Sequence, residues 1–176
     1  MYFYSTIKFM ITIKICHESF FTVHTSWTKK LNKMSITVFF ERDLNKLKEE
    51  INLFENENDI WKTKEGIINS AGNLTMHLLG NLNHFIGKTL ANTDYVRKRD
   101  EEFSVKNISR EKLINDINSL KEMIKTTLPK LSEEDLKETF PLKIQEQTFT
   151  TENMLIFLLA HLNYHLGQIN YLRRIL

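Results

Sequence analysis

The stretch ENMLIFLLAHLNYHLGQINYLRRI, residues 152–175, decides the fold class. Thr150 or Thr151 just before it has a hydroxyl that can cap the free N–H groups of a first helical turn. Arg173 and Arg174 place positive charge at the other end, where the helix dipole is negative. The stretch therefore predicts one long and largely apolar helix over residues 152–175.

Working outward, three more segments have helical patterns. Residues 67–91, IINSAGNLTMHLLGNLNHFIGKTLA, form a second strongly apolar segment. Residues 36–56 carry apolar residues three or four apart, at positions 40, 44, 47, 51 and 54, which is one face of an amphipathic helix. Ser109 is a suitable N-cap for a helix that ends near Leu128. With only five glycines and two prolines in the chain, we predict an all-α, up-down four-helix bundle over residues 34–176.

Three glycines lie inside the segment 67–91, namely Gly72, Gly80 and Gly87. Each costs about 1 kcal/mol relative to alanine in a helix. Their spacing of seven or eight puts them roughly on one side. We expect them to let a neighbouring helix approach closely.

Residues 1–33 differ from the rest, being aromatic and β-branched with five lysines and one acidic residue. A signal peptide fits poorly, because Lys8 and Lys14 interrupt the apolar run and no small-residue cleavage site follows. An additional strand or hairpin is a second interpretation. The interpretation we favour is a non-helical leader in an overextended reading frame, with translation starting at Met34. Without the leader the formal net charge changes from +2 to −2, so the basic charge of the whole chain is no argument for an anionic partner.

The composition of the chain excludes several classes of protein. The single cysteine, Cys16, excludes an intramolecular disulfide framework and fits a reducing compartment, so we expect a cytoplasmic protein. No apolar run approaches the roughly 20 residues that a membrane helix needs. The net charge is too small to indicate nucleic acid. An apolar face of the bundle is compatible with a homodimer.

The histidines carry the chemistry. His161 and His165 are four residues apart, so their side chains lie about 40° apart around the helix and one turn along it. Two imidazoles at this spacing can bind one ion. Two core or surface histidines that satisfy each other would give the same pattern. The apolar surroundings favour the ion, because desolvation keeps an imidazole neutral, and the neutral form is the metal ligand.

The segment 67–91 has a matching polar stripe of Asn73, His77, Asn81 and His84. Burying four polar groups is costly unless they face a site or one another. His77 and His84 lie about 10.5 Å apart along the axis, too far to share an ion. Only one of them can join the pair at 161 and 165, and spacing alone does not say which.

NLTMHLLGNLNHFIG, YVRKRDEEFS and HLNYHLGQINYLRR together resemble the DinB-like family of metal-binding proteins, in the subgroup with HLxGNL and RxRDxEF motifs. The resemblance extends from Met34 to Leu176. It implies a four-helix bundle in which His77, His161 and His165 bind one divalent metal. Imidazole ligands favour zinc or nickel, with iron or manganese as alternatives. The resemblance also implies that His84 is not a ligand. The family often has arginine after the last histidine, where this chain has Leu166, which puts a substrate contact of that arginine in doubt.

Relatives that use bacillithiol or mycothiol imply a small-molecule substrate, with a low-molecular-weight thiol as co-substrate. Asn81 and Gln168 follow His77 and His165 by one turn and are the candidates to orient them; ordinary core amides would have the same spacing. The charge run over 97–102 is expected to be a solvated loop, or else a gate at the mouth of the bundle. Two functions remain open: a metal-dependent transferase or hydrolase, and a non-catalytic dimeric or stress-linked bundle with a structural ion or none.

Overall fold

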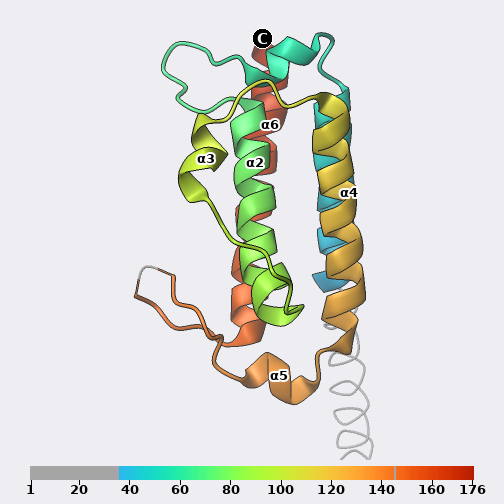
Figure 1. The fold of residues 1–176 in the computed structure, drawn as a ribbon, viewed down its shortest axis with the longest axis vertical. Helices are drawn as coiled ribbons and strands as arrows, with labels where there is room; N and C mark the ends of the chain where they lie inside the picture. Colours follow the sequence, from blue (N-terminus) through green and yellow to red (C-terminus); the bar gives the residue numbers. More distant parts are fainter. Residues whose placement is uncertain (1–35, 145) are drawn as a thin grey trace, which may run out of the picture. The chain divides into compact units, whose positions relative to one another are not determined.

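The structure is a computed structural model that describes residues 36–144 and 146–176. Four long helices make up most of this part (Figure 1): residues 36–52, α2 (Ala71–Leu82) with its π-helical continuation η2 (Asn83–Lys88), α4 (Arg110–Thr127) and α6 (Thr151–Ile175). Shorter helices are η1 (Glu57–Trp61), α3 (Arg99–Ser104), η3 (Leu128–Lys130) and α5 (Glu133–Lys137). The only β pairing among the described residues is two isolated bridges, Thr139–Thr150 and Ile144–Gln147.

The all-α prediction is therefore confirmed for this part of the chain. The predicted leader, residues 1–33, lies outside the described residues. None of the described helices is both long and apolar enough to cross a membrane.

Chain direction decides where the connections run. The helix over 36–52 and α6 point one way, and α2 and α4 point the other way (Figure 1). Because α2 and α4 are parallel, the chain must travel back along the bundle between them, and α3 lies on this return path beside α2. The return path thereby brings a charged segment against the apolar helix α2.

The helix ends follow their capping residues. The hydroxyl of Ser109 accepts a hydrogen bond from the Lys112 amide, and that of Thr150 accepts one from the Asn153 amide, as predicted. Helix α2 begins at Ala71 rather than at 67, because Ser70 caps it. The predicted helix over 36–56 is helical only to residue 52. Helix α5 was not predicted; it begins with a capping box made by Ser132 and Asp135.

The core is formed by the apolar faces of the long helices. All five positions singled out in the first helical segment are buried, namely Phe40, Leu44, Leu47, Ile51 and Phe54. They belong to the same core cluster as the inward leucines and isoleucines of the other long helices. Burying one such side chain contributes about 1.5–3 kcal/mol, so this packing accounts for most of the stability of the bundle.

Two buried carboxylates join the first helix to α6. Asp43 accepts a hydrogen bond from Asn163. Seven residues further along both helices, Glu50 accepts one from Asn170 at 2.9 Å and another from Arg173 at 2.7 Å. The equal spacing fixes how far one helix is displaced along the other.

The glycines of α2 make room for side chains rather than for a helix backbone, contrary to the prediction. A Cβ at Gly72 would lie 2.6 Å from the ring of Trp61, in η1. A Cβ at Gly80 would collide with the carboxylate of Glu102, in α3. Gly80 thus leaves the space in which a charged group is buried against α2.

Candidate metal centre

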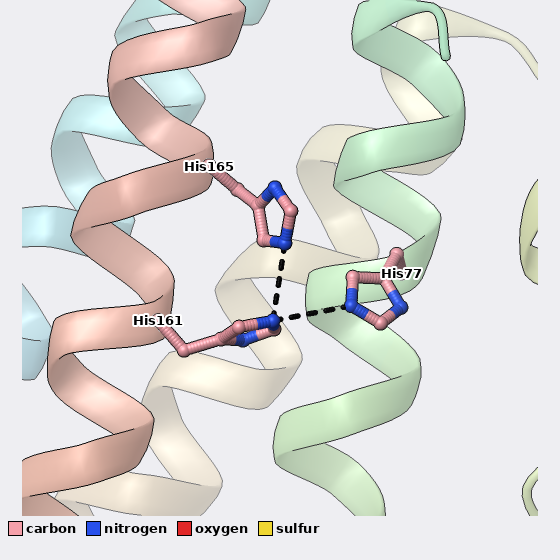
Figure 2. A group of neighbouring side chains, drawn as sticks. All are labelled: His77, His161 and His165. Carbon is pink, nitrogen blue, oxygen red and sulfur yellow. Dashed lines mark hydrogen bonds between the residues drawn. The ribbon is translucent and has the colours of Figure 1, made fainter. Parts of the chain in front are cut away.

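Three histidines converge between α2 and α6. His77 comes from α2, and His161 and His165 come from successive turns of α6 (Figure 2). The Nε2 atom of His161 lies 3.3 Å from Nε2 of His77 and 3.0 Å from Nε2 of His165. All three ligand atoms are within 4.8 Å of one another, and no other group of three or more such side chains occurs in the described residues. The structure thus brings together the three histidines named from the sequence.

In two of the rings, Nδ1 forms a hydrogen bond with a side-chain oxygen atom. Nδ1 of His77 is 2.8 Å from Oε2 of Glu102, and Nδ1 of His165 is 2.6 Å from Oε1 of Gln168. A carboxylate or amide oxygen can only accept, so in both histidines the proton is on Nδ1. In the neutral form of each ring, the Nε2 atom then carries a lone pair that points toward His161.

The three Nε2 atoms cannot all form hydrogen bonds with one another, because too few of them carry a proton. Nε2 of His161 carries at most one proton, so it can bond to one of the two lone pairs and not to both. A cation between the three nitrogens would satisfy them all. Ligands about 2.0–2.1 Å from a tetrahedral ion lie roughly 3.3 Å apart, close to the separations of 3.0 and 3.3 Å found here. The residues therefore fit a metal ion.

The electrostatics favour neutral rings. Burial lowers the pKa of His161 to about 4, with smaller contributions from His165 and His77 and from two nearby arginines. Burial also lowers the pKa of His165, although its hydrogen bond to Gln168 acts in the opposite direction. Both imidazoles are thus neutral at pH 7, which is the form that binds metals.

Glu102 is the residue that sequence reasoning missed. The charge run over 97–102 was expected to be a solvated loop, but the Glu102 carboxylate is buried against α2. Arg97 binds it through two hydrogen bonds, of 2.7 Å from Nε and 3.0 Å from Nη2. Burial raises the pKa of Glu102, but the bonds from His77 and Arg97 outweigh it and hold the pKa below its ordinary value. The other acids of the run, Asp100 and Glu101, are exposed as expected.

The polar stripe of α2 explains how α3 is held. The side-chain amide of Asn73 donates to the backbone oxygens of Glu102, at 3.2 Å, and Val105, at 2.9 Å. One turn later, His77 binds the Glu102 side chain, and its ring lies 4.9 Å from that of Phe103. The need of a buried polar stripe for partners was the one sequence signal that pointed to this contact.

The other polar candidates have different surroundings. Gln168 contacts His165, as described above. Asn81 is buried, its Oδ1 has no partner in the described part of the chain, and no bond joins it to a histidine. His84 stands outside the cluster. Burial, followed by the charges of Arg97 and Lys88, lowers its pKa.

Comparison with known families gives one match. Residues 26–176 match the family described as "Protein of unknown function (DUF1572)". The chain belongs to this family. The DUF1572 match includes all three histidines together with Arg97 and Glu102, and it begins upstream of Met34, within the predicted leader. No curated protein matches the chain significantly.

Proposed function

We propose that this protein is a metal-dependent enzyme in which His77, His161 and His165 hold one divalent ion. The convergence of three Nε2 atoms, two of them with lone pairs directed at the third, carries the proposal. Zinc or nickel suits three imidazoles, with iron or manganese as alternatives.

The proposal includes a relationship to the DinB-like proteins. Two sequence motifs support it, HLLGNL over 77–82 and RKRDEEF over 97–103, because their residues meet around one contact. His77 and Arg97 both bind Glu102, and Gly80 leaves the space that the Glu102 carboxylate needs. The two motifs are thus parts of one structural unit.

The residues around the proposed ion have different roles. Three imidazole ligands would leave a coordination position open, where an ion would polarise a carbonyl or lower the pKa of a water or thiol. Glu102 and Gln168 fix the orientation and tautomer of His77 and His165. Arg97 holds Glu102 in its charged form. This chemistry fits a transferase or hydrolase acting on a small molecule, with a low-molecular-weight thiol as co-substrate in the reducing cytoplasm.

Metal content tests the first half of this proposal. The purified full-length chain, supplied with Zn²⁺ or Ni²⁺ and then desalted, is expected to retain about one ion per chain. His161→Ala should abolish retention, because it removes the nitrogen between the other two. His84→Ala is the matched control, since His84 belongs to the same polar stripe, in η2, but lies outside the cluster. If the wild-type chain retains no ion, the metal proposal fails.

The second half, catalysis, needs an open coordination position. In the Co²⁺-loaded protein, a small thiol should produce a sulfur-to-cobalt charge-transfer band. If the spectrum ignores thiols and the Mn²⁺-loaded protein has no exchangeable water, the ion is structural. The chain would then be a non-catalytic bundle.

A further inference from the structure

A second feature of the bundle lies next to the histidines. A cavity of about 620 Å³ opens between the segment 66–69, the first turn of α2 and the C-terminal half of α6. Its volume is within the range of about 300–1,000 Å³ that is typical of small-molecule sites. Two of its lining residues also contact His165, Gln168 through a hydrogen bond and Tyr164 through its ring.

The lining contains no charged side chain. It consists of glycine, aliphatic, tyrosine and amide residues: Gly66, Ile67, Ile68, Asn69, Leu74, Tyr164, Gly167, Gln168, Tyr171 and Leu172. Tyr164 and Tyr171 are seven residues apart on one face of α6, and both are exposed. Ile68, in the loop before α2, also lines the cavity and is 92% exposed. Such walls suit an uncharged, ring-bearing molecule and offer no ion pair to a carboxylate or phosphate.

Gly167 is the most informative residue of the lining. It lies in the interior of α6, where glycine is less favourable than alanine. Gly72 and Gly80 have packing reasons, but a Cβ at Gly167 would meet nothing within 4 Å, and its φ is not positive. Neither packing nor backbone conformation requires a glycine here. Its effect is to leave the wall of the cavity open between the two tyrosines.

The inner end of the cavity lies one helical turn from the histidines. Leu74 precedes His77 by three residues on α2, and Gln168 follows His165 by three on α6. Gln168 uses its side-chain oxygen to bind His165. Its amide nitrogen has no acceptor in the described part of the chain and can donate to a ligand in the cavity.

We propose that this cavity binds the uncharged aromatic part of a small molecule, with Gly167 providing the space and Gln168 contacting both the ligand and His165. Binding in the cavity does not depend on the metal; identifying the bound molecule as the substrate rests on the proposed function. The two can fail separately, because the metal content is measured without any aromatic ligand.

A neutral fluorescent probe tests the cavity. N-phenyl-1-naphthylamine should bind the full-length protein with an increase in fluorescence. Gly167→Leu places a side chain in the cavity between the two tyrosines and should weaken binding at least tenfold. Ala160→Leu, which adds the same side chain at an exposed position of α6 outside the cavity, should leave binding unchanged. Neutral 2-naphthol should displace the probe at a concentration at least tenfold lower than anionic 2-naphthoate.

Two further variants keep the test decisive if Gly167→Leu does not fold. Ile68→Ser changes a side chain that is almost fully exposed. It should therefore weaken binding of the probe without lowering the melting temperature. Gly167→Ala should raise the melting temperature, because alanine favours the helix and meets no neighbour. Unchanged probe binding in Ile68→Ser, equal losses in Gly167→Leu and Ala160→Leu, or a lower melting temperature in Gly167→Ala would each overturn the proposal.

Discussion

Glu102 links the return path between α2 and α4 to the three histidines. Its side chain accepts from His77 and Arg97, and its backbone oxygen accepts from Asn73. A histidine whose Nδ1 donates to a carboxylate has a fixed tautomer and a more basic Nε2. A neutral side chain of the same shape would keep the contact but lose much of this effect.

We predict that Glu102→Gln lowers affinity for the divalent ion by about 10–100-fold, the usual cost of losing an outer partner of a metal-binding histidine. Isothermal titration with Zn²⁺ measures this change. Glu101→Gln is the matched control, because Glu101 is exposed and pairs with Lys98 on the surface. Equal affinities in the two variants would mean that His77 does not need the carboxylate.

At the scale of helices, the contact between the first helix and α6 depends on Glu50. The carboxylate is buried, and its partners Asn170 and Arg173 are near the end of α6. Burial raises the pKa of Glu50, but the hydrogen bonds from Arg173 and Asn170 outweigh it and hold the pKa below its ordinary value. The charged form of Glu50 therefore stabilises the folded chain.

The sign of the pH effect follows from this lowered pKa. The stabilisation is fully present above the unfolded-state value of about 4.3, and it is lost as the pH falls through the lower folded-state pKa. At pH 7, Glu50→Gln should reduce the free energy of unfolding by about 1–3 kcal/mol, because Arg173 loses a charged acceptor. The difference from wild type should shrink in acid.

Urea unfolding at pH 7 and at pH 3 measures this difference. Glu49→Gln provides the control, since Glu49 is exposed and pairs with Lys46 on the surface. A Glu50→Gln deficit that is the same at both pH values would show that the loss is one of packing rather than charge.

The sequence predicted the long helices well because each has a clear apolar period and an identifiable cap, as at Ser109 and Thr150. It also brought His161 and His165 together, since helical spacing alone determines their separation. Choosing His77 needed the family resemblance. The burial of Glu102 could not be predicted, because its neighbours Asp100 and Glu101 are also acidic and yet are exposed. Which acid of a charge run is buried depends on the path of the chain between α2 and α4.

At the scale of the whole bundle, the candidate site joins two helices that are distant in sequence. His77 lies 84 residues before His161, and α2 and α6 pack side by side. An ion bound to all three histidines needs both helices in place, and an unfolded chain does not hold them together. Ion binding and folding are therefore coupled.

Metal removal should consequently lower the stability of the whole domain. An ion at 100 times its dissociation constant adds about 2.7 kcal/mol if it binds only the folded chain. For a chain of this size each kcal/mol shifts the melting temperature by about 2–4 °C, so chelation should lower it by roughly 5–11 °C. Calorimetry with and without a chelator measures the shift. His161→Ala should melt at one temperature in both conditions, and His84→Ala should respond like wild type. A metal-loaded wild-type chain whose melting ignores the chelator would mean that the ion does not join α2 to α6.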